Sequence, residues 1–206
     1  MNITAIEPRK KGLSTLFIDG EPAFRLDTEI LIAYRFDVGR EIDDAQLKEV
    51  VDASDRKRCK DKAMWLLSYR DYARSELLTK LKKDFGEEAA QAALDRCEEL
   101  GLINDTSFAR RYSADLFHLK HLSKNGVRQK LIQKGIDRDL IDEVLCEFDV
   151  DEEEQIREII EKKFARSLSD EKGRRRAISA LQRMGYSFSA IKPVIREYTD
   201  TEEYYD

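Results

Sequence analysis

One set of apolar and glycine positions recurs in this chain after fifty residues, without a gap. The earlier set is Val127, Leu131, Gly135, Ile136, Ile141, Val144, Leu145 and Phe148, and the later set is Ala177, Leu181, Gly185, Tyr186, Ile191, Val194, Ile195 and Tyr198. A shorter match lies upstream, with one extra loop residue, at Leu77, Leu81, Ala90, Ala93, Leu94 and Cys97. A fixed period of this length indicates one supersecondary unit stacked on copies of itself. Such chains usually present a long surface to a partner and seldom enclose a substrate.

Helix-capping signals mark the boundaries inside each copy. The second helix of the three copies is predicted at residues 75–85, 124–134 and 171–184, and a glycine that can end a helix follows each of them. The third helix begins after Asp137 in the second copy and after Ser187 in the third, because both side chains can accept hydrogen bonds from the first helical amides. These signals predict a mostly α fold of tandem three-helix repeats that form an elongated, curved molecule.

The first quarter of the chain has a different pattern. Residues 13–26 predict a β-hairpin around an Asp19-Gly20 turn of type I′, with Pro22 restricting the second strand to an edge. Residues 3–6 are a candidate third strand. The expected domains are residues 1–40 (hairpin and short helix), 41–106 (connecting helix and first repeat), 107–150 and 151–198 (second and third repeats), and 199–206 (an acidic, disordered tail).

Composition limits the classes of protein. Charged residues make up 38% of the 206 residues, and no apolar run reaches the roughly 18–20 residues of a membrane span. Residues 1–9 lack a secretory apolar segment. Cys59, Cys97 and Cys146 are odd in number and far apart, which matches neither a disulfide framework nor a zinc site. We therefore expect a cytoplasmic protein that has no membrane contact. We also expect a monomer, although composition does not determine the oligomeric state.

The net charge of −5 conceals alternating blocks. Residues 107–138 carry eight Lys and Arg against two Asp and Glu, and residues 162–183 carry the same numbers. Between them, residues 139–161 carry eleven acids and one base. Acids at the start of the helix near residue 152 and bases at its end complement the helix dipole, so the acidic block has a structural explanation. The two basic blocks allow two positive regions.

A search for catalytic constellations finds none. The chain has no phosphate-binding glycine loop, no Gly-x-Ser-x-Gly elbow and no His-Glu-x-x-His motif. His118 and His121 are three residues apart, but no Cys or carboxylate beside them suggests a third ligand. We therefore expect no enzyme activity, no metal and no cofactor, and we interpret both histidines as surface residues.

Basic residues are the better candidates for function. They gather where the second helix of a copy begins, an end that favours anions, and arginine suits carboxylate or phosphate partners. A solvated helix face is an equally good interpretation of the Arg174–Arg176 run. Sequence-specific reading of bases by a helix-turn-helix ranks low, because no convincing set of residues for base edges is present. The candidate contact residues are Arg70, Arg110, Arg111, Lys120, Lys124, Arg128, Lys130, Lys134, Lys172, Arg174, Arg175, Arg176 and Arg183.

The segment of residues 63–77, Ala-Met-Trp-Leu-Leu-Ser-Tyr-Arg-Asp-Tyr-Ala-Arg-Ser-Glu-Leu, resembles the opening signature of RecX, the bacterial regulator of the RecA recombinase. So do Gly101-Leu102-Ile103-Asn104-Asp105, the following Phe108, Ala109 and Tyr112, and residues 124–135. The resemblance covers roughly residues 16–198. The family often has Ser or Thr where this chain has Ala73, so Ser75 or Asp71 is expected to provide that helix cap.

The resemblance implies a non-enzymatic modulator. RecX-like proteins are tandem three-helix repeats that lie in the groove of RecA filaments and inhibit strand exchange, ATP hydrolysis and coprotease activity. RecA and its nucleoprotein filament are accordingly the expected partners, with weak direct DNA binding as an addition, and the basic residues of the second and third copies are the expected contacts. The alternative is a stand-alone nucleic-acid-binding helical module, which would bind DNA without RecA and lose affinity steeply with salt.

Overall fold

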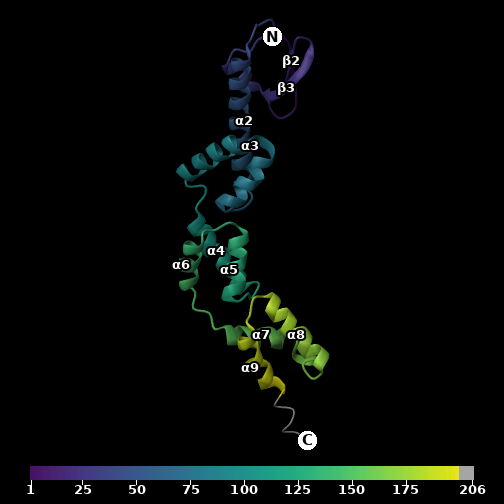
Figure 1. Ribbon diagram of the computed structural model, residues 1–206, viewed down its shortest axis with the longest axis vertical. Helices are drawn as coiled ribbons and strands as arrows, with labels where there is room; N and C mark the ends of the chain where they lie inside the picture. Colours follow the sequence, from purple (N-terminus) through teal and green to yellow (C-terminus); the bar gives the residue numbers. More distant parts are fainter. Residues whose placement is uncertain (200–206) are drawn as a thin grey trace. The chain divides into compact units, whose positions relative to one another are not determined.

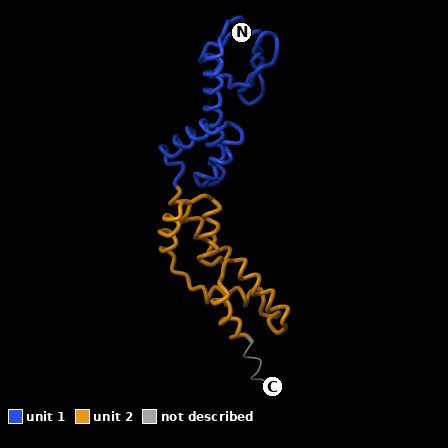
Figure 2. The backbone as a smooth tube through the Cα atoms, viewed as in Figure 1, with its two compact units in different colours: residues 1–104 blue, residues 105–206 orange. Residues whose placement is uncertain are grey.

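The computed structural model describes residues 1–199, and its contacts divide the chain into two compact units, residues 1–104 and 105–206 (Figure 2). Within the described residues, nine α-helices and a three-stranded sheet confirm the predicted mostly α fold with a small N-terminal β region. None of the helices in residues 1–199 is both long and apolar enough to cross a membrane. The acidic tail predicted from sequence falls almost wholly on residues 200–206, outside the described part of the chain.

The first unit opens with an antiparallel sheet of order β1-β2-β3, formed by β1 (Ile3–Pro8), β2 (Leu13–Ile18) and β3 (Glu21–Asp27). Asp19 and Gly20 both have positive φ, 50° and 92°, as a type I′ turn requires. The hairpin prediction is therefore confirmed. The candidate third strand at residues 3–6 is also present, as β1. Pro22 lies in β3, which is an edge strand of this sheet.

Two helices cover this sheet region. The first, α1 (Thr28–Ala33), starts at Asp27, whose carboxylate accepts from the amides of Glu29 and Ile30. The second, α2 (Asp44–Leu67), starts with a complete capping box between Asp43 and Gln46. This long helix runs without a break through Ser54, whose buried hydroxyl accepts a hydrogen bond from the backbone amide of Asp27 at 2.8 Å. The same bond ties α2 to the sheet and α1.

The first repeat is completed by α3 (Arg74–Glu99), which contains a kink at Gly86. Gly86 has φ 77° and ψ 179°, so the two predicted helices are separate segments on either side of it. The apolar side chains of α3 pack against the C-terminal part of α2, and two thiols are buried in this core. Cys97 occupies the core position predicted from the repeat, and Cys59 of α2 belongs to the same cluster.

The second unit contains the second and third repeats (Figure 1). The second consists of α4 (Asp105–His118), α5 (Lys124–Gln133) and α6 (Arg138–Cys146). The third consists of α7 (Glu152–Lys163), a single 3₁₀ turn at Ala165–Ser167, α8 (Glu171–Arg183) and α9 (Phe188–Thr199). The apolar positions that recur after fifty residues are buried in both copies: Val127, Leu131, Ile136, Ile141, Val144 and Leu145, then Ala177, Leu181, Tyr186, Ile191, Val194 and Ile195.

A close backbone contact joins these two repeats within the second unit. The Met184 carbonyl at the end of α8 accepts from the Ser123 amide at 3.1 Å. A Cβ on Gly126 would lie 2.2 Å from the same carbonyl oxygen, and a Cβ on Gly185 would lie 2.4 Å from the Gly126 nitrogen. Only glycine at both positions permits this approach.

Polar groups complete the junction. The carboxylate of Glu152 on α7 accepts from the Lys124 amide at 2.9 Å, where it satisfies an N-terminal donor of α5. The Tyr186 hydroxyl lies 2.9 Å from the His121 carbonyl oxygen and 2.8 Å from the Gln155 side chain. Burial raises the pKa of this phenol, which stays protonated and able to donate. The second and third repeats are thus held together by main-chain contacts that tolerate little displacement.

Candidate interaction surface on the third repeat

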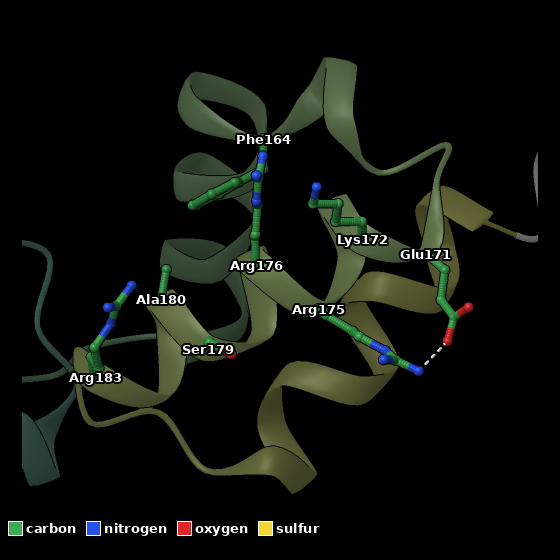
Figure 3. Close-up of a pocket in the computed structure, with 8 residues that line it drawn as sticks. All are labelled: Phe164, Glu171, Lys172, Arg175, Arg176, Ser179, Ala180 and Arg183. Carbon is green, nitrogen blue, oxygen red and sulfur yellow. Dashed lines mark hydrogen bonds and ion pairs between the residues drawn. The ribbon is translucent and has the colours of Figure 1, made fainter.

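An open groove of about 570 Å³ lies along α8, beside the C-terminal end of α7 (Figure 3). Four basic side chains from one helix dominate its lining, and one carboxylate, one aromatic ring and two small residues complete it. The lining residues are Phe164, Glu171, Lys172, Arg175, Arg176, Ser179, Ala180 and Arg183. We call this feature the α8 groove.

The spacing of α8 explains why these residues share a face. Counted from Lys172, the polar residues of the groove follow at i+3, i+4, i+7 and i+11, which is one stripe of an α-helix. The opposite stripe contains Ala177 and Leu181, which are buried in the core of the third repeat. The helix is held at its start by Asp170, whose carboxylate accepts from the Gly173 amide.

Charge compensation differs along the groove. Arg175 turns toward Glu171 and forms an ion pair with it, shown by the dashed line in Figure 3. Lys172, Arg176 and Arg183 point to one side of α8 and are exposed, and none of them forms an ion pair with any residue in 1–199. The described groove therefore has four cations against one carboxylate. Its floor contributes the apolar ring of Phe164, which is half-buried against the core.

The structure separates the arginines of the 174–176 run. Arg174 is half-buried and donates to the carbonyl oxygens of Leu168 and Ser169 at 3.2 and 3.3 Å, so it stabilises the turn before α8. It does not line the α8 groove, whereas Arg175 and Arg176 do. Phe164 and Ser179 line the groove but were not expected from the sequence. The periodicity of α8 could have suggested Ser179, because it lies on the same stripe as Lys172 and Arg176.

In the second repeat, two of the predicted basic residues form ion pairs with acids of the same repeat. Arg110 holds Glu147 through both carboxylate oxygens at 2.6–2.9 Å, and Arg128 pairs with Asp142. The guanidinium of Arg110 lowers the pKa of the Glu147 carboxyl. These acids belong to the block of residues 139–161. Two acids of that block thus neutralise two cations of the preceding basic block. A third acid of the block, Asp151, caps the start of α7.

The contacts of the other candidates in the second repeat include bonds within single helices and one contact with an aromatic ring. The Arg111 side chain donates to the Ser107 carbonyl at 3.3 Å, and Lys130 donates to Gln133 at 3.3 Å. The Lys134 ammonium lies 5.8 Å from the centre of the Tyr112 ring. Lys120 and Lys124 form no ion pair through their side chains with any described residue, and Lys120 is exposed.

Arg70, the candidate in the first unit, is held by its neighbours. Its guanidinium pairs with Glu76 at 2.8 Å and lies 3.6 Å from the centre of the Tyr72 ring. The hydrogen bond to Glu76 raises the pKa of Arg70, which is in any case charged. This arrangement fixes the turn between α2 and α3. It also gives Arg70 and Glu76, two residues of the segment that resembles RecX, a structural role within that turn.

The two histidines are not arranged as a metal site. His118 ends α4, and His121 lies in the loop with φ 49°, where its carbonyl accepts from Tyr186. Within residues 1–199, no group of three or more His, Cys, Asp or Glu is placed to hold a metal ion.

Comparison with known proteins gives one consistent result. Three family models match the chain: the first three-helix domain of RecX at residues 59–97, the second at 104–145 and the third at 151–195. A protein of Clostridioides difficile named regulatory protein RecX is 27% identical and covers 98% of both chains. One of the same name from Bacillus subtilis is 30% identical over 98% of this chain and 79% of its own length.

Solved structures agree with these matches. A crystal structure of regulatory protein RecX is 27% identical, covers 94% of this chain and 98% of its own, and superposes with a TM-score of 0.62. A RecX structure from Lactobacillus salivarius covers 71% of this chain with a TM-score of 0.60, and at 24% identity it supports the fold. The repeat pattern, the three matched three-helix domains and the relatives that align with 98% of this chain together show that the chain belongs to the RecX family of regulatory proteins.

Proposed function

We propose that this protein binds RecA and its filament on DNA, lies along the filament groove, and inhibits strand exchange, ATP hydrolysis and coprotease activity. Membership of a family of regulatory proteins supports a regulatory role, and the partner follows from the resemblance of its motifs to RecX. We further propose that the protein acts as a non-enzymatic monomer in the cytoplasm.

The α8 groove is the single observation that carries the proposed mode of contact. Three of its cations have no counter-charge among residues 1–199, in contrast to Arg110 and Arg128 of the second repeat. Uncompensated cations can pair with an acidic protein surface or a phosphate without first breaking an internal pair. We therefore assign Lys172, Arg176 and Arg183 as the principal contact residues of the third repeat. We expect Arg110 and Arg128, which are already paired with acids, to contribute less to binding.

A titration of RecA ATP hydrolysis on single-stranded DNA tests this proposal. Adding the wild-type protein at substoichiometric ratios should lower the rate, because one bound regulator affects several protomers of a filament. The variant Lys172→Glu/Arg176→Glu/Arg183→Glu should require at least about tenfold more protein for the same effect, since three attractive contacts become repulsive. Its circular dichroism should be unchanged, because all three side chains are exposed.

A matched control separates the local effect from net charge. Lys48 on α2 and Lys192 on α9 are exposed and form no ion pair with a described residue, and Lys10 is exposed in the turn before β2. The variant Lys10→Glu/Lys48→Glu/Lys192→Glu changes the charge equally and should inhibit like the wild type. Unchanged inhibition by the groove variant would remove the α8 groove from the contact surface. Absence of inhibition by the wild-type protein would contradict the proposed function itself.

The alternative function is a stand-alone nucleic-acid-binding module, which the same basic groove favours. A basic groove beside an aromatic ring is a common form of single-strand binding site. Fluorescence anisotropy with labelled single-stranded DNA, without RecA, distinguishes the two. Tight binding whose affinity falls steeply between 50 and 200 mM salt, combined with no effect on RecA, would favour the alternative.

A further inference from the structure

A second basic groove, of about 520 Å³, lies in the first unit between α2 and the part of α3 that follows Gly86. Four of its lining residues lie on α2 at i, i+1, i+4 and i+5, so they form two adjacent rows on that helix: Arg56, Lys57, Lys60 and Asp61. We call this feature the α2–α3 groove. It shares no residue with the α8 groove, and none of the basic residues indicated by the sequence lines it.

The cations on the α2 wall differ in how far they are compensated. The Lys57 ammonium lies 2.8 Å from a carboxylate oxygen of Asp27 and 2.7 Å from one of Glu29, so it is already paired twice. Arg56 and Lys60 are exposed, and the side chain of neither forms an ion pair or a hydrogen bond with any residue in 1–199. Two cations one helical turn apart therefore have no counter-charge in the described part of the chain.

The two other charged residues of the groove are also accessible to a ligand. Arg96 on α3 pairs with Glu99 at 2.7 Å, but both side chains are more than half exposed, so this pair adds little stability and can be exchanged for another acid. The Asp61 carboxylate is exposed and accepts no hydrogen bond from any residue in 1–199. The cation one turn before it is Lys57, which is held by its two acids. The groove thus offers three cations and one open acceptor.

Small and apolar residues complete the groove. Ala92 and Ala93 lie on α3, and Ile30 lies on α1. Ala93 is buried in the core of the first repeat, whereas Ala92 is exposed, and the methyl side chains at both positions leave the space between the helices open. The lining residues include no aromatic ring, so the groove lacks a platform on which a nucleic-acid base could stack.

The spacing of the two uncompensated cations fits an extended peptide. Arg56 and Lys60 are separated by about 6 Å along the axis of α2. In an extended chain every second side chain lies on the same side, at intervals of about 6.4–6.8 Å. Two acids at positions i and i+2 can therefore meet Arg56 and Lys60 together. The side chain between them then faces α3, where Ala92 leaves room, and Asp61 can accept from a backbone amide of the peptide.

From charge, spacing and shape, we infer that the α2–α3 groove binds an extended acidic segment of a partner protein, with acids at alternate positions and a small or apolar residue between them. Arg56 and Lys60 pair with the two acids, and Arg96 attracts the segment from the opposite wall. Asp61 disfavours a nucleic-acid backbone, which carries negative charge and has no amide donor. Binding of such a segment does not depend on the proposed function, whereas the use of this groove to hold RecA rests on it.

The test is a titration of the ¹⁵N-labelled full chain with a short peptide of alternating Glu and Ala. We expect the amide resonances of residues 56–61 and 92–96 to shift, and these shifts give the affinity of this groove separately from that of the α8 groove. The variant Arg56→Glu/Lys60→Glu should bind the peptide about tenfold more weakly at these amides, because two attractive contacts become repulsive. Its circular dichroism should be unchanged, since both side chains are exposed. The matched control Lys10→Glu/Lys48→Glu changes the charge equally and should bind like the wild type.

Two other ligands test the identity of the occupant. A peptide of the same length and charge that repeats Glu-Glu-Ala-Ala has no acids at i and i+2, so it should bind about three- to fivefold more weakly than the alternating peptide. Single-stranded oligothymidylate should leave the resonances of residues 56–61 and 92–96 in place. Tighter binding of the oligonucleotide than of the alternating peptide at these amides would overturn the assignment to an acidic peptide.

Unshifted resonances in both stretches of the groove would overturn the inference, and so would equal affinities of the wild type and the Arg56→Glu/Lys60→Glu variant. Equal affinities for the two peptides would contradict the extended register on which the inference rests. These outcomes do not depend on RecA. Failure of the protein to inhibit RecA, with the peptide bound as expected, would contradict the proposed function alone, whereas RecA inhibition without peptide binding in this groove would contradict the inference alone.

Discussion

Replacing Gly126 by Ala separates the local preference of a helix from the demands of the repeat junction. Gly126 lies in α5, and alanine is favoured over glycine in a helix by about 1 kcal/mol. Helix propensity therefore predicts that the variant is more stable. The structure predicts the opposite sign, because the added Cβ would be 2.2 Å from the Met184 carbonyl oxygen.

The magnitude follows from the contacts that must open. Ordinary contacts of a Cβ begin at 3.4 Å, so α5 and the end of α8 must separate by roughly 1 Å. The bond from the Ser123 amide to Met184 and the bond from the Lys124 amide to Glu152 are then stretched or lost. A neutral bond contributes about 1 kcal/mol and one to a carboxylate about 1.5–3 kcal/mol. After the gain in propensity, the net loss is about 1.5–3 kcal/mol.

Thermal unfolding followed by circular dichroism measures this change. For a unit of about one hundred residues, 1 kcal/mol corresponds to roughly 4–8 °C, so the transition of the second unit should fall by at least about 6 °C. The control is Asn125→Ala, one position earlier in α5, where the side chain is exposed and alanine should not destabilise. A Gly126→Ala protein that is as stable as the control, or more stable than the wild type, would refute the close approach of the repeats.

Two further measurements examine the charges and the thiols. Arg157 lowers the pKa of Glu197 from its usual 4.5, so this ion pair contributes stability above about pH 4.5 that is lost as the pH falls through the lowered value. The variant Glu197→Gln should therefore show a smaller fall of the unfolding midpoint on the acid side of a plot against pH. An acid side that is the same as in the wild type would contradict the pairing. Burial raises the pKa of Cys59 to about 11 and also raises that of Cys97, whereas Cys146 is exposed. A disulfide reagent should thus modify one thiol per native chain quickly and the other two after unfolding, and rapid modification of more than one would contradict the buried core of the first repeat.

Interactions within a few residues of one another were predictable from the sequence. The Asp137 cap and the Asp19-Gly20 turn occur where the sequence predicted them. The Asp27 cap and the Asp43–Gln46 capping box found in the structure are interactions of the same short range. The apolar stripes of the repeats were predictable for the same reason, because a helix places residues three and four apart on one face whatever lies opposite.

The function of individual basic residues depended on the fold. Arg110 and its partner Glu147 are 37 positions apart, so no local rule indicates that this cation is compensated. Within the run at 174–176, a rotation of about 100° per residue directs Arg174 to the preceding turn and Arg176 to the groove. Composition and charge blocks locate a basic region but do not identify its uncompensated members.

The sequence by itself thus determined the repeat architecture, the helix ends, the buried stripes and the family, since each depends on short-range spacing or on motif similarity. Only the tertiary structure decided which cations remain without a partner among the described residues, and why Gly126 and Gly185 must both be small. Both properties arise where helices distant in sequence meet, and there the direction and separation of the helix axes determine which atoms come into contact.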